Sequence, residues 1–194
     1  MRVAIVKYNA GNTVSVTNAL KRLGVETVVT DSPDELREAD KVIFPGVGEA
    51  STAMSYLRER GLDVVIRLLT QPVLGICLGM QLMCSYSEEN DTTCLGILPH
   101  RVRRFESDTL KVPHTGWNRI TDLNSPLFAG ISEGLHVYFV HGYYVETGVE
   151  TTAVTEYGIS FSAGVDRGNF HAIQFHPEKS GDAGALILEN FLKI

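Results

Sequence analysis

Short apolar runs alternate with amphipathic segments along the first half of the chain. The run Val3–Val6 is too short for a helix and has no polar face, as is typical of a strand covered on both sides. Apolar residues then recur at helical spacing from Val16 to Leu23, and Gly24 supplies a helix stop. The same alternation predicts strands at 25–29, 42–44 and 73–76, and helices from residue 33 and over 53–61, 64–69 and 78–84. We therefore expect an α/β fold with a mostly parallel, twisted sheet flanked by helices.

The pattern changes beyond Glu88 to strand-like runs separated by turn residues. These runs lie at 102–105, 116–120, 137–145, 152–155, 159–165 and 170–175. Closely spaced runs of this kind are typical of antiparallel neighbours, so we expect an antiparallel, β-rich second half. A last amphipathic segment, 183–191, predicts a helix. No low-complexity linker, fixed repeat or charge run interrupts the chain, which predicts a single domain over residues 1–194.

Composition narrows the class of protein further. The chain has 194 residues, of which 44% are hydrophobic and 21% charged, and a formal net charge of −6. This excludes a disordered chain and argues against a nucleic-acid binder, which needs a positive surface. The three cysteines are an odd number without metal-ligand spacing, which favours a reducing compartment and no metal site. No apolar stretch is long enough to span a membrane, so we expect a cytoplasmic protein.

The sharpest local feature is the pentapeptide around Cys77, between a predicted strand and a predicted helix. Gly75 and Gly79 flank the cysteine at −2 and +2, as a nucleophile on a tight strand-to-helix turn requires. The helix N-terminus favours thiolate over thiol, and the amide of Leu78 is placed to donate to an oxyanion. The alternative is a buried core cysteine framed by glycines for packing.

A cysteine nucleophile needs a base, and the base needs an acceptor that orients it. The triplet His176-Pro177-Glu178 supplies both directly after the predicted strand 170–175. Functional sites of open α/β sheets gather at the carboxyl ends of strands, where Cys77 also lies. We therefore predict Cys77, His176 and Glu178 as a catalytic triad.

The remaining histidines are weaker candidates for the base. His141 lies in an apolar strand without a carboxylate two residues away, which favours a core or pocket-lining residue. No catalytic role is predicted for His100, His114, His136 or His171.

Three motifs together resemble the class I (triad) glutamine amidotransferases in order, spacing and strand context. They are Pro45-Gly46-Val47-Gly48, Gly75-Ile76-Cys77-Leu78-Gly79-Met80-Gln81 and Phe175-His176-Pro177-Glu178. The resemblance covers nearly the whole chain and implies a flavodoxin-like α/β fold. The stretches 113–118 and 138–144 are most similar to the glutaminase subunits of imidazole glycerol phosphate synthases, which act in histidine biosynthesis.

This resemblance implies that Cys77 attacks the side-chain amide of L-glutamine and that His176, oriented by Glu178, transfers the protons. It also implies an oxyanion hole and contacts to the amino-acid end of glutamine. The residues matching these positions are Leu78 with Val47 or Gly48 for the oxyanion hole, and Gln81, His141, Gly142 and Tyr143 for glutamine. The family commonly has Ser or Thr where this chain has Gly142.

In the family, the ammonia passes to a separate (β/α)₈ cyclase subunit, which uses it to make imidazole glycerol phosphate and an aminoimidazole carboxamide ribotide. The resemblance therefore implies a heterodimer and no cofactor. The residues that would face the partner are Asn12, Trp117, Tyr138 and Lys179.

Three alternatives remain open from the sequence. The first is a glutaminase of another pathway, such as pyridoxal phosphate or aminobenzoate synthesis. The second is a non-catalytic regulatory module that keeps the fold. A peptidase of similar fold is the third, although Gln81 and the His-Pro-Glu triplet are then unexplained.

Overall fold

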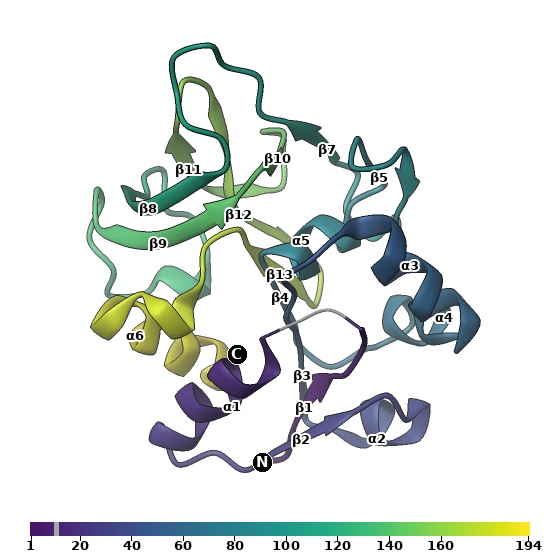
Figure 1. Ribbon diagram of the computed structural model, residues 1–194. Coiled ribbons are helices and arrows are strands. Elements are labelled where there is room, and N and C mark those ends of the chain that lie inside the picture. Colours follow the sequence, from purple (N-terminus) through teal and green to yellow (C-terminus); the bar gives the residue numbers. More distant parts are fainter. Residues whose placement is uncertain (10–11) are drawn as a thin grey trace.

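A large twisted sheet forms the middle of the molecule in the computed structural model (Figure 1), which describes residues 1–9 and 12–194. Its main path runs β2-β1-β3-β4-β13-β12-β10-β7-β5-β6, and β11 pairs with β12. The strands of its first half are β1 (Val3–Val6), β2 (Thr27–Thr30), β3 (Lys41–Phe44) and β4 (Val73–Ile76). These four strands are parallel to their neighbours, as the apolar runs predicted.

The strand β2 begins two residues later than the apolar pattern predicted. Gly24, with φ of 74°, ends helix α1 (Thr13–Arg22), and its amide donates to the carbonyl of Lys21. The amide of Val25 also donates back into the helix, to Leu20. Val25 therefore belongs to the helix end and is not free to start the strand.

Helices cover both faces of the parallel strands (Figure 1). α1 and α6 (Gly181–Lys193) lie together on one face, where Leu20, Ile187 and Phe191 join the same apolar cluster. The other face is covered by α2 (Pro33–Glu38), α3 (Ala50–Glu59), α4 (Leu62–Arg67) and α5 (Leu78–Met83). Both faces of β1 and β3 are consequently buried, which explains their unbroken apolar character.

The second half of the chain is β-rich, as expected, but one neighbour relation differs from the prediction. β13 (Phe170–Ile173) is antiparallel to β12 (Ser160–Arg167) and parallel to β4 on its other side. It joins the parallel and antiparallel halves, a long-range relation that sequence spacing does not encode. The other strands of this half are β7 (Arg101–Arg104), β10 (Tyr143–Val145), β11 (Thr151–Glu156) and the unpredicted two-residue pair β5 (Tyr86–Ser87) and β6 (Thr92–Thr93).

A separate two-stranded ribbon consists of β8 (His114–Arg119) and β9 (His136–His141). The predicted strand 137–145 is therefore two strands, which divide at Gly142 between the ribbon and the main sheet. Short 3₁₀ turns, η1 (Pro126–Phe128) and η2 (Pro177–Lys179), complete the fold. Across residues 1–9 and 12–194, no helix combines the length and apolar character needed to cross a membrane.

Candidate active site

Cys77 occupies a strained turn between β4 and α5. Its φ of 53° and ψ of −109° lie outside the regions that L residues ordinarily adopt, and it is the N-cap residue of α5. The Cys77 amide donates to Ile173 of β13, which ties the turn to the neighbouring strand. This backbone holds the sulfur at the carboxyl edge of the parallel strands.

The glycines around the turn are required by close packing. A Cβ on Gly79 would lie 1.8 Å from the carbonyl oxygen of Phe44, and one on Gly75 would lie 2.9 Å from the sulfur of Met83. Contacts this short do not occur in folded proteins. The sequence prediction that both positions must be small therefore has a steric basis.

His176 and Glu178 lie next to the same edge, after β13. The Nδ1 atom of His176 is 2.9 Å from Oε1 of Glu178, and both side chains are almost completely buried. A carboxylate only accepts, so Nδ1 carries the hydrogen and Nε2 faces the site. Among the described residues, Nε2 has no hydrogen-bond partner of good geometry.

The charge on His176 is set by its two neighbours. Burial lowers its pKa, but the Cys77 sulfur and the Glu178 carboxylate together outweigh this effect and raise the pKa to about 10. The structure therefore brings the predicted nucleophile, base and orienting carboxylate together across 99 residues of sequence.

The loop Pro45–Gly48 packs against the elbow. The carbonyl of Gly46 accepts a hydrogen bond of 3.3 Å from the amide of Leu78. The carbonyl of Pro45 accepts one of 2.6 Å from the buried hydroxyl of Tyr8. The Leu78 amide, an expected oxyanion donor, is therefore occupied by the loop in this conformation.

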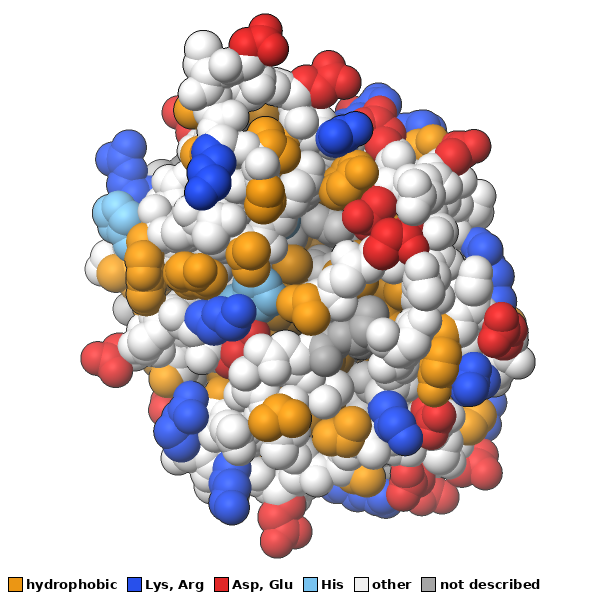
Figure 2. Space-filling view, viewed as in Figure 1, with side chains coloured by type: hydrophobic (Ala, Val, Ile, Leu, Met, Phe, Trp, Pro, Cys, Tyr) orange, Lys and Arg blue, Asp and Glu red, His pale blue; other side chains and the backbone are white. Residues whose placement is uncertain are grey.

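A cavity of about 360 Å³ opens beside Cys77. All seven residues predicted for the oxyanion hole and for substrate binding line it, together with Cys77, Glu89 and Val140; the seven are Val47, Gly48, Leu78, Gln81, His141, Gly142 and Tyr143. Figure 2 shows a histidine side chain near the middle of one face of the molecule, with hydrophobic side chains above and beside it and a Lys or Arg side chain at its lower left.

Gln81 is one of the best-fixed side chains of the cavity wall. Its amide nitrogen donates to the carbonyl of Tyr143 and to Oε1 of Gln174, both at 3.0 Å. The amide of Gln174 in turn lies 3.6 Å from the sulfur of Cys77. These bonds join α5 to the two segments that follow β9 and β13.

Sequence reasoning missed three residues of this region. Gln174 lies one residue before the predicted end of a strand, and Glu89 and Tyr8 lie outside every motif of the sequence. Glu89 lines the cavity and accepts a hydrogen bond of 2.8 Å from the amide of Ala50, while burial raises its pKa. An acidic residue following an apolar helix gives no sequence signal of this kind.

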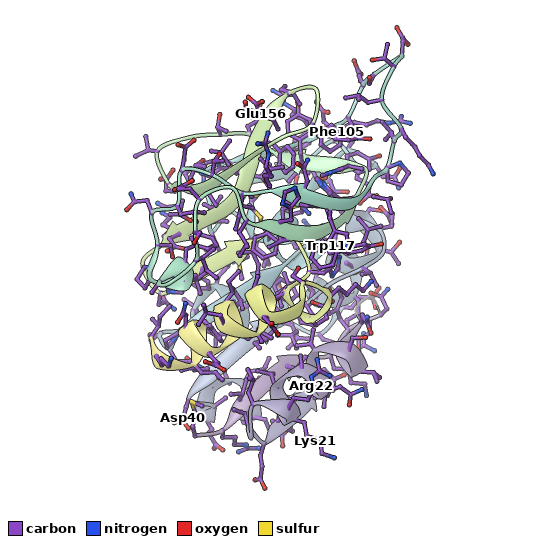
Figure 3. The ribbon with its side chains drawn as sticks, turned by 90° about the vertical axis from the view of Figure 1, so that its left-hand side faces the viewer. Lys21, Arg22, Asp40, Phe105, Trp117 and Glu156 are labelled. Atoms are coloured by element: carbon purple, nitrogen blue, oxygen red, sulfur yellow. The ribbon has the colours of Figure 1, made fainter. Side chains whose placement is uncertain are left out.

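The residues expected to face a partner do share a surface in part. Trp117 is 55% exposed and packs edge-on against Tyr138 of the facing strand, with ring centroids 6.0 Å apart. Lys179 lies over the same tyrosine ring, 5.7 Å from its centroid. Figure 3 shows Trp117 at about mid-height in the molecule, above Lys21 and Asp40, which lie at its lower end. Asn12 instead caps α1 and accepts from the amide of Ser15.

Two other kinds of site, an anion site at Arg103 and a metal centre, can be compared with the structure. Arg103 is one of three arginines in the short stretch 101–104. It is paired with Glu88 and Glu146, at 2.8 and 2.7 Å, so its charge is already compensated. Within the described part of the chain, no group of three or more His, Cys, Asp or Glu side chains is arranged to hold a metal ion.

Comparisons with known proteins give a consistent family. The model of the class-I glutamine amidotransferase family matches residues 4–194. The chain is 57% identical over 196 aligned positions to the imidazole glycerol phosphate synthase subunit HisH of Bacteroides fragilis, with full coverage of both chains. It is 44% identical to the HisH subunit of Haemophilus influenzae, covering 100% of this chain and 98% of the relative.

Solved structures support the fold. A putative GMP synthase protein from Thermoplasma acidophilum superposes with a TM-score of 0.78 at 20% identity, covering 100% of this chain and 92% of that chain. A structure described as a glutamine amidotransferase superposes with a TM-score of 0.75 at 21% identity, covering 98% and 97%. The predicted α/β class, with its mostly parallel sheet and flanking helices, is confirmed.

Proposed function

This chain belongs to the class-I glutamine amidotransferase family, and from that premise we propose that Cys77, His176 and Glu178 release ammonia from glutamine. It acts as a glutamine amidotransferase subunit of imidazole glycerol phosphate synthase in histidine biosynthesis. The observation that supports the triad most directly is the strained Cys77 turn beside an imidazole that Glu178 orients.

In the proposed reaction the side chain of glutamine enters the cavity beside Cys77. The thiol of Cys77 first gives its proton to Nε2 of His176, whose raised pKa favours the charged ring, and the sulfur then attacks the amide carbon. The tetrahedral intermediate collapses to a thioester as His176 gives that proton to the departing nitrogen, which leaves as ammonia. Water, deprotonated by the same imidazole, then cleaves the thioester to glutamate and restores the thiol.

The oxyanion hole has to form during this reaction. Leu78 donates to Gly46 in the present conformation, so the loop has to move before this amide can stabilise an oxyanion. Gly48, with φ of 128°, gives the loop the backbone freedom for such a rearrangement. We propose that Leu78 with Val47 or Gly48 then supplies the donors.

Substrate recognition uses the wall of the cavity. We propose that Gln81, His141, Gly142 and Tyr143 hold the amino-acid end of glutamine, mostly through backbone groups. The carboxylate of Glu89 adds a negative group to the same cavity, which suits the α-ammonium of the substrate.

We further propose that a (β/α)₈ cyclase subunit receives the ammonia as a heterodimeric partner. The exposed Trp117, packed on Tyr138, is an aromatic anchor of the kind that dominates protein interfaces. Lys179, beside this pair, offers a cation for a carboxylate of the partner. Asn12 is included in the proposed face on the family resemblance alone.

The first test is Cys77→Ala in the complex with the cyclase. Glutamine hydrolysis is expected to fall at least about 1,000-fold because the nucleophile is lost, whereas synthesis from added ammonium salts persists. The matched control is Cys84→Ala, because Cys84 ends the same helix and is buried. Undiminished glutamine consumption by Cys77→Ala would exclude the proposed mechanism. A glutamine-analogue adduct on Cys77 distinguishes an active triad from a non-catalytic module.

A further inference from the structure

Two buried histidines face each other across the β8–β9 ribbon. His114 and His141 are directly paired in the antiparallel register, and both are nearly inaccessible, at 3% and 5% exposure. Nδ1 of His114 lies 3.0 Å from Nε2 of His141. Only His141 lines the cavity beside Cys77, so His114 stands behind the cavity wall.

The hydrogen-bond partners determine where each proton lies. Nδ1 of His141 is 2.7 Å from the carbonyl of Tyr143, which only accepts, so that nitrogen carries a hydrogen. In a neutral ring Nε2 of His141 is then an acceptor, and Nδ1 of His114 has to donate to it. Nε2 of His114 is left to accept from the amide of Asn118, at 3.3 Å. Both rings are therefore neutral Nδ1–H tautomers.

The bonds continue into the proposed substrate site. The same Tyr143 carbonyl accepts from Gln81, which is also bonded to Gln174 beside Cys77. Asn118 is fixed at the other end, because its amide also donates to the carbonyl of Glu156, at 2.9 Å. Glu156, which accepts this last bond, is labelled with Phe105 in the upper part of Figure 3. A continuous series of hydrogen bonds thus runs from Asn118 of β8 through both histidines to the Tyr143 carbonyl at the cavity wall.

The surroundings favour neutral rings. His114 stacks on Tyr157 and Phe139, with centroids 4.0 and 5.0 Å away, and Phe105 and Phe161 contact the pair edge-on. Burial lowers the pKa of His114 to about 4 and that of His141 to about 3. His114 of β8 and His176, which follows β13, both lower the pKa of His141 further.

We propose that His114 is a positioning residue for glutamine binding, which acts by donating its Nδ1–H to His141 and so fixes the Tyr143 carbonyl and the Gln81 side chain. The proposal rests on the proposed function, because the affected step is the binding of glutamine in the cavity. His114 itself does not touch the substrate site.

The tautomers are tested first, without reference to activity. Histidine side-chain ¹⁵N spectra of the protein in the complex should show two neutral rings protonated on Nδ1, unchanged down to about pH 5. Neutral histidines free in solution favour the other nitrogen. Either ring appearing as the Nε2–H form, or charged at pH 6, would overturn the inference.

Two substitutions of equal size separate the hydrogen bond from packing. In His114→Asn, the amide nitrogen occupies the place of Nδ1 and still donates, whereas His114→Leu fills similar space without a donor. In the complex, His114→Leu should raise KM for glutamine about tenfold with kcat within about twofold, because ground-state positioning is lost. His114→Asn should keep KM within about twofold of the unmodified chain.

The outcomes are distinguishable from failure of the proposed function. If the unmodified complex hydrolyses no glutamine, the proposed function fails, while the ¹⁵N spectra still report on the histidine pair. If the unmodified complex is active but His114→Leu and His114→Asn have the same KM for glutamine, the positioning role fails, whether or not that KM differs from the unmodified value. Activity that falls equally in both variants through kcat likewise assigns His114 a structural role only.

Discussion

Backbone alone forms the cavity wall at Gly142. A Cβ on this residue meets no atom within 4 Å, and its φ lies outside the left-handed region that would strain a side chain. Gly142→Ser therefore fits, and we expect its hydroxyl to contact the amino-acid end of glutamine in the proposed site. One added hydrogen bond is worth about 1 kcal/mol, so KM for glutamine should fall about fivefold.

The control for this prediction is Gly142→Ala, which adds the same Cβ without the hydroxyl. In steady-state glutaminase assays of the complex, the alanine variant should have a KM for glutamine close to that of the unmodified chain. A serine variant no better than the alanine variant would show that the backbone already makes the relevant contacts.

Individual residues were predictable where the chemistry is local. The steric need for small neighbours makes Cys77 visible in a pentapeptide, and His176 lies two residues from its orienting carboxylate. Gln174 and Glu89 act through contacts made only after folding, as in the 3.0 Å bond between Gln174 and Gln81 across 93 residues. Such partners leave no periodicity or motif for sequence reasoning to detect.

At the scale of elements, the approach of α5 to β3 sets the geometry of the nucleophile. The first turn of α5 touches the backbone of Phe44 at Gly79. Gly79→Ala should therefore force the helix away from the strand and cost about 3 kcal/mol in the free energy of unfolding. For a chain of this length, that lowers Tm by about 10 °C.

Thermal unfolding of Gly79→Ala should be compared with that of Gly142→Ala, where the added methyl group has room. The control is expected within about 1 kcal/mol of the unmodified chain. Equal stability of the two variants would mean that α5 can shift without cost, contrary to the packing described.

Elements were predictable where the apolar pattern is strong and buried. The parallel strands follow from unbroken runs such as Val3–Val6, whereas the two-residue strands β5 and β6 are too short to carry any period. The place of β13 between β4 and β12 was not predictable, because strand order depends on long-range pairing. That pairing nevertheless brings His176 next to Cys77.

For the whole molecule, size and charge fit a division of labour between two chains. With 194 residues and a net charge of −6, the subunit is suited to a small zwitterion such as glutamine, not to a phosphorylated nucleotide. Arg103, one of the three arginines in the stretch 101–104, is paired with Glu88 and Glu146. We accordingly propose that the phosphorylated compounds of the synthase reaction are bound by the proposed partner.

Stability of the whole molecule should fall as the pH drops below about 6.5. Burial lowers the pKa of His114 to about 4 and of His141 to about 3, so between about pH 6.5 and 4 the unfolded chain binds two protons that the folded chain does not. The free energy of unfolding then approaches a slope of about 2.7 kcal/mol per pH unit from this pair. His176, with its pKa raised to about 10, has the opposite sign: its contribution is present below about pH 6.5 and is lost as the pH rises towards 10.

Urea unfolding at pH 5, 6 and 7 measures this slope. In His114→Leu only one of the two histidines remains to bind a proton on unfolding. The slope of the unfolding free energy against pH should therefore decrease by about 1.4 kcal/mol per pH unit below pH 6. Unchanged slopes in the variant would mean that His114 is charged in the folded chain at these pH values. Such a charge would also contradict the tautomer deduced from its contacts, because the Nδ1–H of His114 is required for His141 and its other nitrogen has to accept from Asn118.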